Sequence, residues 1–181
     1  MNSTALDPLM TLLWPNADDL SGDGVYCVLD GARDPEILKW LRLSGLKFSC
    51  LYSGQLTPSL EAAAPYLVQL TPTSPATREL LERGWGRAWG IFIFAPAALP
   101  MPTIRLHLKK FLRVRTEDKK LLMFRYYDPR VLSVFLPTCT GEEFTKFLGP
   151  LNRLLVELDA GARWSLFDLE DQRLRIVSGV H

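Results

Sequence analysis

The chain has 181 residues, of which 48% are hydrophobic and 23% are charged. This length and composition are typical of one globular domain with its own core, and they argue against an intrinsically disordered chain. The formal net charge of +1 provides no global field that would draw the protein to nucleic acid or to a membrane, so we expect neither as a partner.

Cysteine usage predicts a reducing compartment. Cys27, Cys50 and Cys139 form no closely spaced pair, and two of them lie within apolar runs, where a thiol behaves as a small hydrophobe. We find no basic N-terminal segment followed by an apolar stretch and no apolar run of membrane-spanning length. We therefore expect a cytoplasmic protein.

Charge is unevenly distributed along the chain. Residues 1–30 contain five acidic residues and no Lys or Arg, whereas residues 105–130 contain nine basic and three acidic residues. One interpretation is that two solvated faces attract each other within the fold. The other is that the basic stretch forms a surface for an acidic partner.

Strand and helix patterns alternate through the first 112 residues. We expect a short helix within 6–14, strands at 25–29, 48–52, 65–70 and 89–94, and helices at 35–43, 77–83 and 103–112. Asp34 and Pro35 are suited to begin the helix at 35–43, and Thr103 is suited to cap the helix at 103–112. The strand–helix–strand order of the first fifty residues is typical of a βαβ unit. The strand at 89–94 is the most apolar and is expected to be central.

The pattern of residues 113–181 predicts two hairpins and two helices. The first hairpin pairs 114–115 with 121–126 around the polar turn 116–119, and the second pairs 154–158 with 164–168. Asp128-Pro129 begins a helix to Leu136, and Thr140 with Glu143 forms a capping box for a helix ending at Leu148. The expected fold is mixed α/β: a central mixed sheet flanked by helices, with a small C-terminal helix–hairpin appendage.

We divide the chain into three parts: an acidic N-terminal segment (1–23), an α/β core (24–136) and a C-terminal extension of the same domain (137–181). Little in these parts suggests catalysis or cofactor chemistry. There are only two histidines, His107 and His181, and no Cys/His cluster at ligand spacing, so we expect no metal and no cofactor. His107 is expected on a helix surface. A Gly-x-Ser-x-Gly nucleophile elbow is also absent.

A glycine- and tryptophan-rich cluster spans residues 84–90. It leads into a strand, whereas a dinucleotide-binding loop follows a strand and begins a helix, so we exclude nucleotide binding here. The cluster either forms a tight entry into the strand with Trp85 and Trp89 in the core, or presents Trp85, Arg87 and Trp89 as a recognition surface. Of the three, Trp89 suits the core better and Arg87 suits a contact.

The second cluster is Phe124–Arg130. In a strand, Arg125 and Tyr127 would share one face, which could form a polar aromatic site. The alternative is an internal network in which Arg125 or Arg130 pairs with Asp30 or Asp128 and fixes the strand-to-helix corners.

Three segments, taken together and in order, resemble the bacterial adaptor-chaperone family of the type VI secretion system. They are Leu29–Pro35, Gly84–Phe92 with its Trp-Gly-x-x-Trp-Gly motif, and Phe124–Leu132 with Arg-Tyr-Tyr-Asp-Pro-Arg. The resemblance covers about residues 24–150 and includes the short strand beginning at Pro65. Many members of that family have a longer helical C-terminal part.

The resemblance implies a non-catalytic protein that binds a secreted effector protein and helps load it on the VgrG spike protein. The candidate partner-binding residues are Asp30, Arg33, Trp85, Arg87, Trp89, Arg125, Tyr127, Asp128 and Arg130. An enzyme with an unrecognised site around Asp30, Arg33 and Asp128 is the alternative. A nucleic-acid binder using residues 105–130 is a third hypothesis, which the balanced net charge disfavours.

Overall fold

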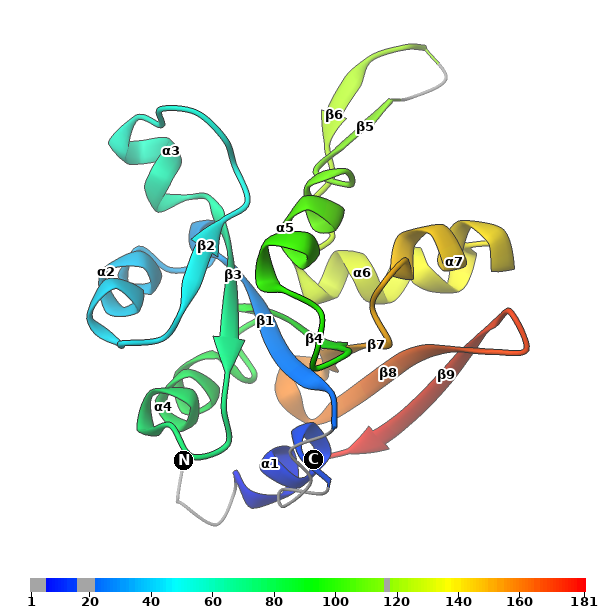
Figure 1. Ribbon diagram of the computed structural model, residues 1–181, viewed down its shortest axis with the longest axis horizontal. Coiled ribbons are helices and arrows are strands. Elements are labelled where there is room, and N and C mark those ends of the chain that lie inside the picture. Colours follow the sequence, from blue (N-terminus) through cyan, green and yellow to red (C-terminus); the bar gives the residue numbers. More distant parts are fainter. Residues whose placement is uncertain (1–5, 16–21, 116–117) are drawn as a thin grey trace.

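A computed structural model describes residues 6–15, 22–115 and 118–181 (Figure 1). Expectations for Asp18, Asp19, Thr116 and Glu117 lie outside these ranges. The helices are α1 (Asp7–Leu13), α2 (Glu36–Leu43), α3 (Pro58–Ala62), α4 (Pro75–Gly84), α5 (Met101–Lys109), α6 (Pro129–Phe135) and α7 (Gly141–Leu148), with short 3-10 turns η2 (Gly31–Arg33), η3 (Leu136–Thr138) and η4 (Asp159–Gly161). The strands are β1 (Gly24–Asp30), β2 (Phe48–Cys50), β3 (Pro65–Leu70), β4 (Gly90–Ala95), β5 (Arg113–Arg115), β6 (Leu121–Met123), β7 (Arg153–Leu158), β8 (Arg163–Glu170) and β9 (Arg173–Val180).

The mixed α/β class is confirmed, with one seven-stranded sheet in the order β2-β3-β1-β4-β7-β8-β9. β4 is its middle strand, as expected. Every neighbouring pair in this sheet is antiparallel, so the expected mixed strand directions are not found. β1 and β2 do run in the same direction, as in a βαβ unit, but β3 lies between them and pairs with both.

Helices cover both faces of the sheet, and the strand residues alternate between two cores (Figure 1). Val25, Cys27 and Leu29 of β1 face the core that also contains residues of α1, α2 and α4. Tyr26 and Val28 face the opposite core, which contains residues of α5, α6 and α7. The apolar run of β1 is therefore buried on both faces.

The C-terminal part is larger than the expected appendage. β7 pairs with β4, and β8 and β9 extend the same sheet, so this part continues the central sheet instead of hanging from it. The alternating, largely exposed pattern of β9 gave only a weak strand signal, and the sequence interpretation missed it.

The expected first hairpin is present as β5 and β6, which form a separate two-stranded sheet. Its second strand is shorter than predicted, because residues 125–128 form a turn in which the Asp128 N–H donates to the Arg125 carbonyl at 3.0 Å. The expected strand-like alternation of Arg125 and Tyr127 is therefore wrong. Tyr126 and Tyr127 are both buried, whereas Arg125 is exposed.

Of the other local predictions, some are confirmed and others are wrong. The capping box of Thr140 and Glu143 is formed. α5 begins at Met101, so Thr103 lies inside its first turn, and α3 was not foreseen. His107 is not on the surface: it is 8% exposed, and its Nε2–H donates to the Phe147 carbonyl at 2.8 Å. In the part of the chain that the structure describes, no helix is long and apolar enough to cross a membrane.

Candidate functional site

Three segments that are distant in the sequence meet at one end of β1 and β4. The first is the η2 turn after β1, the second is the loop between α4 and β4, and the third is the turn before α6. The Asp30 N–H donates to the Trp89 carbonyl at 2.7 Å, which joins the first two segments. A Cβ atom at Gly31 would lie 2.4 Å from the Ala62 carbonyl oxygen, so this close approach requires glycine.

Asp30 connects the first segment to the third. Its side chain is fully buried, and it accepts a hydrogen bond from the Ala32 N–H at 3.1 Å. The other carboxylate oxygen pairs with the Arg125 guanidinium across 95 residues of sequence. Because a buried carboxylate needs a nearby cation, this pair fixes the turn before α6 against the end of β1.

Asp128 forms a second pair, with Arg130. Asp128 caps α6 by accepting from the Arg130 N–H at 3.0 Å, and it receives two further bonds from the guanidinium, at 2.9 Å from Nε and 2.6 Å from Nη2. Burial acts to raise the pKa of Asp128, but these hydrogen bonds outweigh it and hold that pKa below its usual value. The carboxylate is thus anionic at neutral pH.

Glu157 of β7 joins the site from the C-terminal part. Its two carboxylate oxygens accept hydrogen bonds from the Gly86 and Ala88 N–H groups, both at 2.6 Å. Gly86 and Ala88 have positive φ angles of 82° and 55°, and this turn directs both N–H groups at the carboxylate. Burial raises the pKa of Glu157, and the two N–H groups oppose that shift.

Arg33 lies between these acidic groups. Its charge acts to lower the pKa of both Asp128 and Glu157, and its Nη2 donates to the Arg87 carbonyl at 3.3 Å. The Arg33 Nε is buried and has no hydrogen-bond partner among the described residues. Arg33, Arg87, Arg130 and Glu157 together line an open hollow of about 400 Å³, hereafter the arginine hollow.

The structure brings most of the nine predicted residues together but places them differently. Trp85 and Trp89 are buried in the core on one face of the sheet, and Tyr127 is buried in the core on the other. Asp30 and Asp128 are also buried, as counter-ions of arginine. Arg87, Arg125 and Arg130 are exposed, and Arg33 is half-buried. Of the nine predicted residues, the four arginines are therefore the ones that reach the protein surface.

The alternative of an internal network is thus the arrangement that the structure contains. Both proposed kinds of pair are present, as Arg125 with Asp30 and Arg130 with Asp128. The sequence interpretation missed Glu157, although a single carboxylate within the apolar run Leu154–Leu158 was a usable signal of a buried polar contact. The described residues contain no group of three or more His, Cys, Asp or Glu side chains arranged to hold a metal ion.

Comparison with known proteins gives a family but no function. Searches of curated proteins and of solved structures returned no match. A family model described as "Domain of unknown function (DUF4123)" matches residues 25–146. The matched span includes the four arginines of the site and ends before Glu157. Because it covers more than half of the 181 residues, the chain belongs to this family of domains of unknown function.

Proposed function

We propose that this protein is a non-catalytic cytoplasmic adaptor that binds a type VI secretion effector and helps load it on the VgrG spike. The proposal starts from the resemblance of its three motif segments to secretion adaptors. The observation that carries it is the arginine hollow, because guanidinium groups from three distant segments converge on one open surface. Arginine is over-represented among the residues that dominate binding energy at protein interfaces.

The state of the carboxylates favours binding over catalysis. A general acid or base must be able to exchange a proton with a substrate, so its oxygens must be accessible. Asp30 and Asp128 are buried and already paired with Arg125 and Arg130. Glu157 has both oxygens engaged by backbone N–H groups. These contacts support a structural role for the acids and a recognition role for the arginines, against the alternative of an enzyme around Asp30, Arg33 and Asp128.

Arg87→Ala tests the proposal without disturbing the fold. Arg87 is exposed, and no hydrogen bond or ion pair with a described residue engages its guanidinium. The purified full chain is titrated with a candidate effector and with a VgrG protein from the same genome, and its affinity for each is measured by calorimetry. We expect wild-type protein to bind the effector and Arg87→Ala to weaken binding by about thirtyfold, the equivalent of ~2 kcal/mol.

Arg173→Ala is the matched control, since Arg173 is exposed on β9 outside the arginine hollow, and we expect it to bind like wild type. A folded wild-type chain that binds neither protein would refute the adaptor proposal. An Arg87→Ala protein with unchanged affinity would show that the hollow does not contact the effector.

A further inference from the structure

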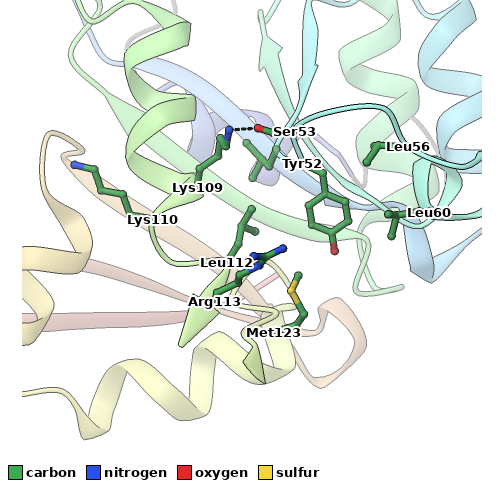
Figure 2. Close-up of a pocket in the computed structure, with 10 residues that line it drawn as sticks. Tyr52, Ser53, Leu56, Leu60, Lys109, Lys110, Leu112, Arg113 and Met123 are labelled. Carbon is green, nitrogen blue, oxygen red and sulfur yellow. Dashed lines mark hydrogen bonds between the residues drawn. The ribbon is translucent and has the colours of Figure 1, made fainter. Parts of the chain in front are cut away.

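A second hollow, larger than the arginine hollow, lies between α5, the β5–β6 hairpin and the chain that follows β2 (Figure 2). Its volume is about 580 Å³, and we call it the apolar groove. Leu51 and Leu112 form a buried floor, whereas Leu60 of α3 and Met123 of β6 are 46% and 50% exposed. Single exposed apolar side chains are ordinary on a protein surface, but their grouping around one groove favours a binding surface.

The walls of the groove are held in place by polar contacts. Arg105 of α5 donates to the carbonyls of Cys50 at 2.7 Å and Tyr52 at 3.1 Å, which joins the helix to the end of β2. Lys109 of the same helix bonds to the Ser53 hydroxyl (Figure 2). The groove is therefore already formed in the free protein, and binding there does not require this wall to become ordered.

The hairpin wall is different, because β5 and β6 pair only with each other. All three residues of β6 are exposed, and an isolated two-stranded hairpin is marginally stable in water. A segment seated in the groove would cover Met123 and give this hairpin a packing partner.

The rim of the groove is basic. Lys109, Lys110 and Arg113 line it, and none of its ten lining residues is acidic. Among the described residues, no carboxylate lies within ion-pair distance of Lys110 or Arg113. Three positive charges at one apolar site are complementary to a ligand that carries both acidic and apolar groups.

The acidic N-terminal part of the chain does not supply these charges where the structure describes it. Asp7 lies 3.8 Å from Arg78, and Asp23 lies 2.8 Å from Arg153. α1 lies at the opposite end of the molecule from the β5–β6 hairpin (Figure 1). No described residue of the N-terminal part therefore supplies negative charge to the rim.

We propose that the apolar groove binds an acidic amphipathic segment of the effector, with apolar side chains on the leucine floor and carboxylates against the basic rim. This inference rests on the proposed adaptor function and adds to it a second contact surface and a chemistry for the bound segment. Nucleic acid fits the groove less well, because Tyr52 is the one aromatic side chain among its ten lining residues and the rest of the apolar lining is Leu and Met.

A peptide series tests the chemistry independently of any effector. The probes are peptides of about 14 residues that share one pattern of leucines and differ only in having Glu, Gln or Lys at the other positions. Binding to the full chain is measured by fluorescence anisotropy at low and at physiological salt. We expect the Glu peptide to bind at least about tenfold more tightly than the Gln peptide, with a difference that shrinks in salt, and the Lys peptide not to bind.

Variants then locate the binding site. Lys110→Glu with Arg113→Glu should abolish the preference for the Glu peptide, and Leu60→Asp should abolish binding of both the Glu and the Gln peptide. The matched controls are Lys146→Glu with Arg173→Glu, which makes the same change in net charge on exposed residues of α7 and β9, and Leu43→Asp on α2, where the leucine is 87% exposed. Both controls should bind like wild type.

Equal binding of the Glu and Gln peptides, absence of binding at about 1 mM, or binding that survives the groove variants would each overturn the groove proposal. Effector capture separates it from the adaptor function. If wild type captures the effector and the groove variants capture it equally well, the groove is wrong and the function stands. If wild type captures no effector but binds the Glu peptide through the groove, the adaptor function is wrong and the groove chemistry stands.

Discussion

Asp30 is the residue on which the geometry of the site depends most. It is the last residue of β1, it caps the η2 turn, and it forms an ion pair with Arg125, which is 95 residues away in the sequence. A carboxylate that is fully buried loses its hydration, and it is stable there only because a guanidinium and an N–H group replace the lost water.

Replacing Arg125 with Ala should therefore destabilise the protein by removing the counter-ion of Asp30. Loss of one partner from a fully buried pair costs about 3–5 kcal/mol, and we expect about 2 kcal/mol here because Arg125 itself is 43% exposed and partly screened by water. Urea unfolding followed by circular dichroism measures this change.

The second substitution Asp30→Asn should recover part of the loss in the Arg125→Ala background. An amide at position 30 carries no charge, and its oxygen can still accept the Ala32 N–H. Arg163→Ala is the comparison, because its pair with Asp159 is more than half exposed on both sides and should contribute little. Equal losses for Arg125→Ala and Arg163→Ala would mean that the Asp30 pair has no special weight.

His107 predicts a pH dependence of stability. Burial lowers its pKa below the ordinary value of 6.5, and the contact with the Phe147 carbonyl opposes that shift only partly. In the unfolded chain His107 takes up a proton near pH 6.5, whereas in the folded chain it remains neutral to lower pH. The unfolded state then binds more protons, so stability should fall as the pH drops below about 6.5.

Thermal unfolding of wild type, His107→Gln and His181→Gln between about pH 7.5 and 5.5 isolates this contribution. The His107→Gln protein should lose less stability over that range than wild type does. His181→Gln should keep the wild-type dependence, because His181 is exposed. Parallel curves for wild type and His107→Gln would show that His107 titrates in the same way in both states.

At the level of elements, β7 gives the family-matched part of the chain both core and polar support. Leu154, Leu155 and Val156 of β7 and Phe167 of β8 are at most 1% exposed. Glu157 of the same strand fixes the turn that carries Arg87. The matched span ends at residue 146, before any of these residues.

We expect a chain ending at Pro150 to lose cooperative folding, since it lacks those four apolar side chains. At about 1.5–3 kcal/mol for each buried side chain, the loss is ~6–12 kcal/mol, which is comparable with the whole stability of an ordinary domain. A chain ending at Asp171 lacks only β9, whose residues are mostly exposed, and should unfold cooperatively at a lower temperature. Scanning calorimetry distinguishes these outcomes, and a cooperative transition in the shorter chain would contradict the expectation.

At the level of the whole molecule, local patterns predicted the elements better than their arrangement. The run 25–29 and the Thr140–Glu143 capping box carry their own signals, and both predictions are confirmed. The insertion of β3 between β1 and β2 depends on pairing between distant residues, which no local pattern records. β9 was missed because an edge strand with exposed residues lacks the apolar run that marks a buried one.

For the site too, local motifs were easier to predict than the way they pack together. Arg, Asp and aromatic residues in short motifs predicted residues that the structure brings together, and an internal Arg–Asp network was one of the two interpretations. Trp89 is buried and Arg87 exposed, as the sequence favoured, but exposure in the second motif could not be predicted, because it depends on how the turn at 125–128 packs. Strand alternation placed Tyr127 with Arg125, whereas the turn buries the tyrosine and exposes the arginine. The apolar groove also escaped prediction, since its walls come from three separate segments.

The arginine hollow has a consequence for synthesis of the protein. Its lining comes from residue 33, from 86–88, from 129–133 and from 157–160. The last group includes Glu157, whose carboxylate fixes the turn that carries Arg87. Because a ribosome synthesises the chain from its N-terminus, this surface cannot be complete until residue 160 has been translated. Any molecule that recognises the hollow must therefore meet a chain in which β7 has already been synthesised, and it has no complete binding surface on a shorter nascent chain.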